Sequence, residues 1–318
     1  MRGFITDPSA PSGLRLTEDL PEPEPAEDEF LLGLRAYAIN PGEALLISQR
    51  PTDWRPGQDV AGVVLRAARD GSGPPEGARV AAILDWAGWA ERVPVPTRWA
   101  TVLDDGVSFE QAATLPIAGL TALRALRAGG AVLGRRVLIT GATGGVGQFA
   151  VQLAAASGAH VTALVSGPDR VAEARELGAH DVVTTLDGPD LAPFHLVLDG
   201  IGGETLTKAV RRLVPGGTVA LYGGSGGPAN LHIGDFYASG LGARIVSVFG
   251  PLPEDTKGED IGLLAGLVAD GRLTPKIGWR GDWTSTQDAF AALAARDYRG
   301  KAVLTVQGTD CPVLDKWV

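Results

Sequence analysis

The stretch Val137-Leu-Ile-Thr-Gly-Ala-Thr-Gly-Gly-Val-Gly147 indicates the fold of this chain. An apolar strand leads into glycines spaced G-x-x-G-x-x-G, and a predicted helix follows at once from Gln148. Glycines let backbone N–H groups and the positive end of that helix reach a pyrophosphate, because a Cβ would hold the phosphates away. The spacing differs from G-x-G-x-x-G, so the context predicts the dinucleotide site, against the alternative of a tight turn alone. The candidate binding residues are Gly141, Thr143, Gly144, Gly145, Val146 and Gly147.

The end of the next predicted strand indicates which dinucleotide binds. An NAD-specific site usually has an acidic residue there to hold the ribose 2′-hydroxyl. This chain has Ser166 at that place and Arg170 one helical turn further on. A hydroxyl and a guanidinium suit a 2′-phosphate, so the sequence favours NADP(H). The alternatives are that Arg170 is a solvated helix residue and that Asp169 is only a helix N-cap.

Predicted strands and helices alternate from about residue 108, which is typical of a doubly wound α/β fold with a parallel sheet. Before that point the chain is β-rich and broken by Gly and Pro turns, which favours a compact barrel or sandwich. The expected strands cover 14–16, 29–39, 60–65, 78–84, 89–93, 136–140, 161–165, 181–184, 195–198, 218–222, 244–249 and 301–306. The expected helices cover 109–115, 118–127, 145–157, 169–177, 204–213, 259–270 and 286–296.

Composition excludes several classes of protein. Hydrophobic residues are 45% and charged residues 20% of the 318, which is an ordinary globular composition. The net charge of −9 argues against binding to nucleic acid or to anionic membranes. The single cysteine, Cys311, favours a reducing compartment, and the four histidines show no metal-binding spacing. With neither a signal peptide nor an apolar run of membrane length, the sequence predicts a cytoplasmic, metal-free protein.

Seven segments, in order over nearly the whole chain, carry a family resemblance. They are 34–42 (Leu-Arg-Ala-Tyr-Ala-Ile-Asn-Pro-Gly), 57–64, 112–123, 176–179, 198–203, 214–218 and 300–304. In them the chain resembles the zinc-free quinone oxidoreductase (zeta-crystallin-like) branch of the medium-chain dehydrogenase/reductase superfamily. Zinc-binding relatives have Cys, His and Glu ligands early in the chain, whereas the first His here is His160 and the only Cys is Cys311.

The resemblance implies the domain organisation and the activity. It implies a β-rich, GroES-like catalytic domain made of residues 1–115 and 257–318, with a Rossmann NADP(H)-binding domain, 116–256, inserted between its parts. Family members use NADPH to reduce quinones or α,β-unsaturated carbonyl compounds, and a homodimer is expected. Two alternatives stay open: an enoyl-thioester or polyketide-tailoring reductase, and a non-catalytic NADPH-binding protein.

The resemblance also implies site residues. Asn40 matches the Asn beside the nicotinamide, where its amide would polarise a substrate carbonyl, although Asn also favours a turn before Pro41. Thr121 resembles the hydroxyl on the nicotinamide side, or is a helix-interior Thr. Tyr222 ends a strand at the edge where α/β folds bind ligands, and Phe249 resembles the loop that covers the nicotinamide; core packing is the alternative for both.

Two further questions stay open in the sequence. The proton for the reduction comes either from water or from Tyr37. Four tryptophans that lie close together in the sequence either line a pocket for an aromatic substrate or, as is commoner, anchor the core. They are Trp54, Trp86, Trp89 and Trp99.

Overall fold

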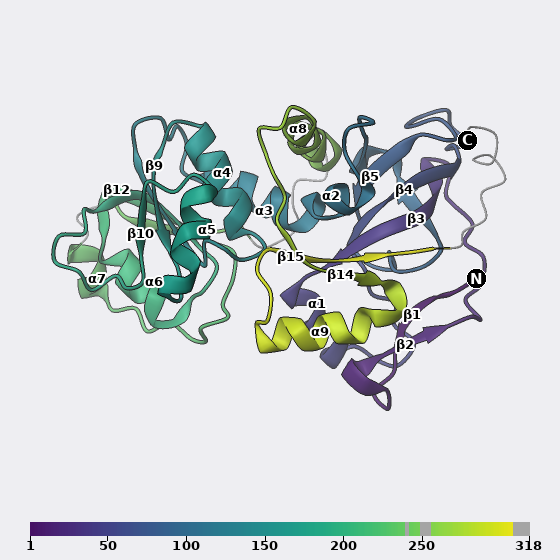
Figure 1. Ribbon diagram of the computed structural model, residues 1–318, viewed down its shortest axis with the longest axis horizontal. Coiled ribbons are helices and arrows are strands. Elements are labelled where there is room, and N and C mark those ends of the chain that lie inside the picture. Colours follow the sequence, from purple (N-terminus) through teal and green to yellow (C-terminus); the bar gives the residue numbers. More distant parts are fainter. Residues whose placement is uncertain (239–241, 249–255, 308–318) are drawn as a thin grey trace. The chain divides into compact units, whose positions relative to one another are not determined.

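The computed structural model describes residues 1–238, 242–248 and 256–307 (Figure 1). Contacts divide the chain into two units, and each is described by itself. Unit 1 consists of Met1–Ile117 and Pro253–Val318, and unit 2 of Ala118–Leu252. Unit 2 therefore interrupts unit 1 in the sequence. Within the described residues, no helix has the length and apolar character needed to cross a membrane.

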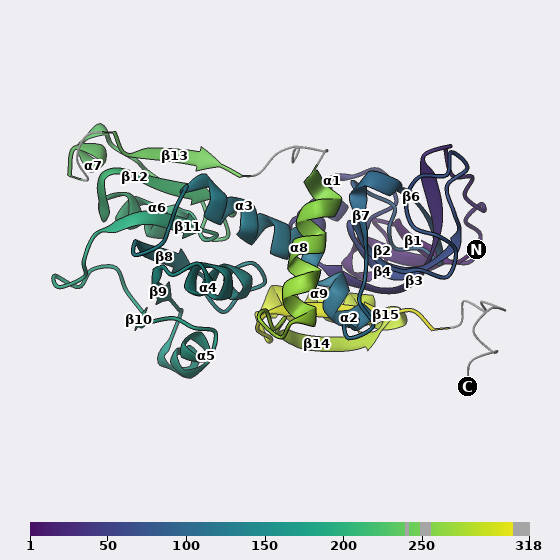
Figure 2. The same cartoon turned by 90° about the horizontal axis from the view of Figure 1, so that it is seen from above.

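Unit 2 contains a parallel sheet of six strands in the order β10-β9-β8-β11-β12-β13. From β8 the chain adds β9 and β10 on one side of the sheet, and then adds β11, β12 and β13 on the other side of β8 (Figure 2). The strand order therefore reverses between β8 and β11, which is the switch point of the sheet. The strands are β8 (Arg136–Thr140), β9 (His160–Leu164), β10 (Asp181–Val183), β11 (Phe194–Asp199), β12 (Leu213–Leu221) and β13 (Arg244–Ser247). The helices are α3 (Leu120–Ala128), α4 (Gly147–Ala156), α5 (Val171–Glu176), α6 (Gly203–Val210) and α7 (Ile233–Ala238).

The central strands of unit 2 are continuously apolar because helices cover the sheet. Val137, Leu138 and Ile139 of β8 are all fully buried, as parallel strands between helical layers usually are. Helices α3 and α4 pack against each other and against the central strands of this sheet. The predicted doubly wound parallel sheet is confirmed.

Unit 1 is built on a mainly antiparallel sheet of seven strands, and β1 and β2 form a separate antiparallel pair. The order is β14-β15-β3-β4-β5-β7, and β6 pairs with β3. The strands are β1 (Gly3–Thr6), β2 (Leu14–Thr17), β3 (Glu29–Ile39), β4 (Asp59–Arg66), β5 (Arg79–Ile83), β6 (Arg92–Pro96), β7 (Ala100–Val102), β14 (Ile277–Asp282) and β15 (Lys301–Thr305). The helices are α1 (Pro41–Gln49), α2 (Phe109–Ala113), α8 (Lys257–Ala269) and α9 (Thr286–Ala295).

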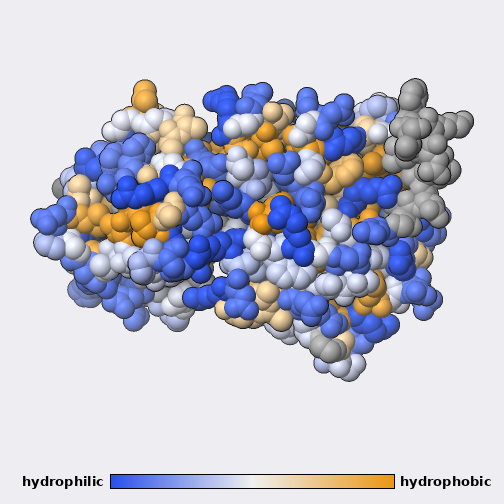
Figure 3. All heavy atoms as spheres, in the orientation of Figure 1, coloured by the Kyte–Doolittle hydropathy of each residue, from blue (hydrophilic) through white to orange (hydrophobic). Residues whose placement is uncertain are grey.

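An aromatic cluster fills the core of unit 1. Trp89 stacks on Tyr37 with ring centroids 5.0 Å apart and contacts Phe4 and Phe290. Trp89 and Trp99 are buried, so these two tryptophans are core anchors. On the surface, hydrophilic residues surround smaller apolar patches on the face in view (Figure 3).

One local prediction for unit 1 was wrong, and one helix was not predicted. Strand β3 ends at Ile39 as expected, and α1 begins at Pro41, because Pro is favoured in the first turn and the Glu43 side chain accepts a hydrogen bond from the Asn40 N–H at 2.8 Å. The strand expected over 89–93 lies at Arg92–Pro96 instead, because the Trp89 N–H is bonded to Pro56 O and its ring belongs to the core.

Candidate functional site

The glycine loop of unit 2 is too tight for side chains at its key positions. Gly141 has φ +60°, and a Cβ at Gly147 would lie 2.2 Å from Gly141 O and 2.8 Å from Ala142 Cα. The Gly144 N–H donates to Gly141 O at 2.9 Å, which closes the turn directly before α4. The first N–H groups of a helix have no partner within that helix, so the loop presents donors and the positive helix end together.

A buried carboxylate joins the carboxyl ends of β8 and β11 at the switch point. Thr140 Oγ1 donates to Asp199 Oδ1 at 2.6 Å, and Asp199 Oδ2 accepts from the Gly202 N–H at 2.9 Å. Burial raises the pKa of Asp199 above its ordinary value, against the effect of these hydrogen bonds. We infer that Asp199 fixes the glycine loop and the 200–203 loop relative to each other. This role of Asp199 was not predicted from the sequence, although Asp-Gly directly after an apolar strand indicates it.

The structure brings Arg170 to the glycine loop. Arg170 Nη1 lies 3.3 Å from Thr143 Oγ1, although 27 residues separate them in the sequence. Ser166 is exposed just after the end of β9. The Arg170 guanidinium therefore lies beside Thr143 of the glycine loop.

Tyr222 directly follows β12 and carries an unsatisfied hydroxyl. The side chain is 7% exposed, and among the described residues its Oη has no hydrogen-bond partner. Burial, and secondarily Asp199, raises the pKa of this hydroxyl, so it is a neutral donor. The Tyr222 ring occupies the space that a side chain at residue 200 would need: a Cβ added to Gly200 would lie 2.5 Å from Cε2 of the ring. A buried donor without a partner is costly unless a ligand supplies the acceptor.

These features of unit 2 fit a dinucleotide. The glycine cradle, the guanidinium of Arg170 and the orphan Tyr222 hydroxyl lie at or beside the carboxyl ends of the strands, where open α/β sheets bind ligands. Thr121, in the first turn of α3, is half-buried. Phe249 lies outside the described residues, so its role stays a prediction, as does that of Thr121.

In unit 1 the structure argues against Tyr37 as a proton source. The side chain is fully buried, and its hydroxyl is bonded to Thr286 Oγ1 at 2.5 Å. Burial raises its pKa well above the ordinary value of a tyrosine. A hydroxyl enclosed between β3 and α9 has no access to a substrate, so Tyr37 has a structural role.

Asn40 belongs to a buried polar cluster with Glu43, Asp59 and Lys301. Asn40 Nδ2 donates to Asp59 Oδ2 at 2.9 Å and to Glu43 Oε2 at 3.3 Å, and Asn40 Oδ1 accepts from Lys301 Nζ at 2.5 Å. Both amide hydrogens are therefore engaged within unit 1. The predicted role of Asn40 in polarising a substrate carbonyl does not fit this bonding, whereas its position beside a coenzyme stays a prediction.

The Tyr37→Phe variant tests this reassignment. We expect kcat to stay within about twofold of the wild type, because no proton passes through the hydroxyl. We expect the free energy of unfolding to fall by about 1 kcal/mol, the usual cost of one buried hydrogen bond. Steady-state kinetics and urea denaturation measure the two effects. A loss of kcat by about a hundredfold with unchanged stability would restore Tyr37 as the proton source.

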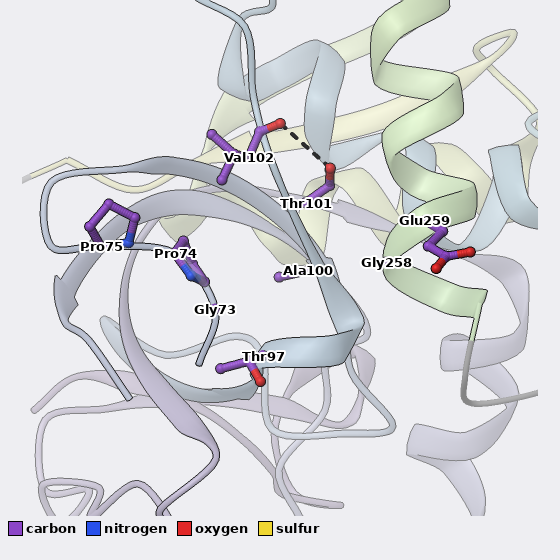
Figure 4. A pocket seen from close by; sticks show the side chains of 9 residues that line it. All are labelled: Gly73, Pro74, Pro75, Thr97, Ala100, Thr101, Val102, Gly258 and Glu259. Atoms are coloured by element: carbon purple, nitrogen blue, oxygen red, sulfur yellow. Dashed lines mark hydrogen bonds between the residues drawn. The ribbon is translucent and has the colours of Figure 1, made fainter. Parts of the chain in front are cut away.

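Unit 1 also has a surface pocket of about 380 Å³, between the 73–75 loop, β7 and the start of α8 (Figure 4). Its lining is apolar or hydroxyl-bearing apart from Glu259, and Thr101 Oγ1 faces its neighbour's carbonyl, Val102 O, at 3.5 Å. None of the sequence-predicted site residues lines this pocket. Within the described ranges, no three His, Cys, Asp or Glu side chains are grouped so that they could hold a metal ion.

Comparisons with known proteins agree with this geometry. A family model described as zinc-binding dehydrogenase matches residues 145–265. Human mitochondrial NAD(P)H oxidoreductase RTN4IP1 is 38% identical over 167 residues, which cover 48% of this chain and 42% of that protein. The 2-methylene-furan-3-one reductase of Solanum lycopersicum is 28% identical over 94% of this chain and 77% of its own length. Human quinone oxidoreductase is 28% identical over 84% of this chain and 86% of its own.

A solved structure shares the fold over nearly the whole chain. Escherichia coli quinone oxidoreductase, solved in complex with NADPH, superposes with a TM-score of 0.86 at 22% identity and covers 96% of this chain and 100% of its own. In its fold, its glycine loop and these matches, the chain resembles the quinone oxidoreductase-like branch of the medium-chain dehydrogenase/reductase superfamily. The predicted resemblance is confirmed.

Proposed function

We propose that this protein uses NADPH to reduce quinones or α,β-unsaturated carbonyl compounds, without zinc. The observation that carries the proposal is the glycine cradle between β8 and α4, with Arg170 bonded to it. The names of two relatives, a quinone oxidoreductase and a 2-methylene-furan-3-one reductase, support this substrate class. The absence of Cys and His before His160 supports zinc-independent chemistry.

The residues of unit 2 would hold the coenzyme, which supplies a hydride when bound. Amide groups of residues 141–147 would bind the pyrophosphate, and Arg170 would pair with the 2′-phosphate. The Tyr222 hydroxyl would donate its hydrogen bond to the coenzyme. Because Tyr37 is enclosed and both amide hydrogens of Asn40 are engaged, we assign the proton to water.

The Arg170→Ala variant tests the choice of coenzyme. We expect the KM for NADPH to rise about tenfold or more, because a charge-assisted hydrogen bond to phosphate is lost. The KM for NADH should change less than about twofold, since NADH has no 2′-phosphate. The matched control is Arg175→Ala, which removes an exposed arginine on α5. Equal increases in the KM for NADPH and the KM for NADH would show that Arg170 does not bind the 2′-phosphate.

An oxidation assay tests the activity itself. Purified protein is mixed with NADPH and with 1,4-quinones, small enones or 2-enoyl thioesters, and loss of NADPH absorbance is followed. We expect turnover with the quinones or enones. Turnover of thioesters alone would identify a tailoring reductase instead, and NADPH binding without oxidation would identify a non-catalytic protein.

The assembly and the location of the protein are part of the same proposal. A homodimer rests on the family resemblance, and a cytoplasmic location on the single cysteine and the composition. The molar mass in solution, measured by light scattering, tests the dimer: twice the chain mass of 32.9 kDa is expected.

A further inference from the structure

Two of the four clustered tryptophans do not belong to the core of unit 1. Trp54 and Trp86 are half-buried, and their ring centroids are 5.1 Å apart at an interplanar angle of 57°. Their segments are bonded to each other, since the Ala87 N–H donates to Arg55 O at 3.0 Å. The pair therefore presents part of its aromatic surface to the outside, unlike the buried Trp89.

A cation covers this pair of rings. Arg50 directly follows α1, is exposed, and has its guanidinium carbon 5.4 Å from the Trp54 ring centre and 5.6 Å from that of Trp86. In the part of the chain that the structure describes, no carboxylate pairs with Arg50. The guanidinium is held by two aromatic faces while its hydrogen-bond donors stay available.

A second guanidinium follows Trp54 in the chain and lacks an acceptor. Arg55 is half-buried, and its Nη2 is a buried atom with no hydrogen-bond partner among the described residues. Burial lowers the pKa of Arg55, which reflects the cost of a cation removed from water without compensation. The acidic residues next to the two tryptophans form ion pairs with other side chains. Asp53 lies 4.0 Å from Arg15, and Asp85 lies 3.7 Å from Lys257.

We propose that Arg50, Trp54, Arg55 and Trp86 form a binding site for a planar aromatic carboxylate. The aromatic group would stack on the indole surface, and the carboxylate would accept hydrogen bonds from the guanidinium groups. The two unpaired arginines disfavour a cationic ligand. This site lies wholly within unit 1 and does not depend on the coenzyme or on the proposed reductase activity.

Calorimetric titration of the full chain with 2-naphthoate tests the proposal. We expect saturable binding at one site, and binding of the neutral isostere 2-naphthamide that is weaker by about tenfold. Arg50→Gln and Arg55→Gln should each weaken 2-naphthoate binding by about tenfold, because each removes a cation. Arg50 is exposed, so Arg50→Gln keeps the fold and gives an answer even if Arg55→Gln proves unstable.

Arg98→Gln is the matched control. Arg98 also lies over an indole, 5.4 Å from the Trp99 ring centre, but it is bonded to Asp28 Oδ2 at 3.0 Å. Its replacement should leave 2-naphthoate binding unchanged. The proposal is overturned if the wild type does not bind 2-naphthoate, if the amide binds equally well, or if Arg50→Gln binds like the wild type. Since the readout needs no NADPH, a failure here is distinct from a failure of the reductase assay.

Discussion

The Lys301→Met variant is expected to lose about 3–5 kcal/mol of the free energy of unfolding, the usual cost of removing one partner from a buried ion pair. The Lys301 ammonium is buried and donates to Ile39 O at 3.0 Å, Asn40 Oδ1 at 2.5 Å and Asp59 Oδ2 at 3.2 Å. Methionine has a similar volume but no charge, so Asp59 would keep a buried charge without its cation. Urea denaturation followed by circular dichroism measures the loss.

The size of this loss should rise with pH because of Glu43. Burial, with a further contribution from Asp59, raises the pKa of Glu43 to about 8 in the folded protein. A group with a raised folded pKa contributes stability that is complete below its unfolded pKa and is lost as the pH rises through the folded value. Lys301 opposes that rise in pKa, so we expect Lys301→Met to cost more at about pH 9 than at about pH 5.

Lys208→Met is the control for a lysine that lies at the surface. Lys208 forms ion pairs with Asp187 and with Glu204 on α6, and both carboxylates are exposed. Little change in stability is expected from its replacement, because solvent screens such pairs. A Lys301→Met variant as stable as Lys208→Met would contradict the account of the buried cluster.

The Gly147→Ala variant is expected to weaken NADPH binding by about a hundredfold, equivalent to about 3 kcal/mol. The added Cβ would lie 2.2 Å from Gly141 O and 2.8 Å from Ala142 Cα, so the loop must open where its amides would hold the phosphates. Titration followed by NADPH fluorescence gives the Kd. Gly188→Ala, in a loop of the same unit with no atom within 4 Å of the new Cβ, should bind NADPH like the wild type. If Gly147→Ala binds NADPH as tightly as the wild type, the phosphates do not bind at this loop.

Local patterns in the sequence were enough to predict most of the fold. Strands β3 and β8 were predicted with the bounds that the structure has, because long apolar runs end there at Asn-Pro-Gly and Gly-Ala. Helix α1 was missed because Pro and Gly read as breakers, although Pro in the first turn is favourable. The strands β1 and β7 were missed because four and three residues carry little periodicity. Strand β14 was missed because Gly and charged residues interrupt its sequence, Ile-Gly-Trp-Arg-Gly-Asp.

The candidate site was predictable where its residues belong to the strand–loop–helix motif or follow the next strand. The glycine loop is one continuous motif, and Arg170 follows the end of β9, so the sequence indicated both. The bonding of Asn40 did not follow from the sequence, because Lys301, one of its partners, is 261 residues away. Tyr37 likewise has its partner Thr286 249 residues away, and no local pattern indicates that its hydroxyl is enclosed.

The most direct test of the central claim is hydrogen–deuterium exchange of the full-length protein with and without saturating NADPH. The amides of residues 141–147 are expected to exchange more slowly when NADPH is bound, because they donate to its phosphates. Exchange of this segment that stays unchanged at saturating NADPH would contradict the proposed coenzyme site.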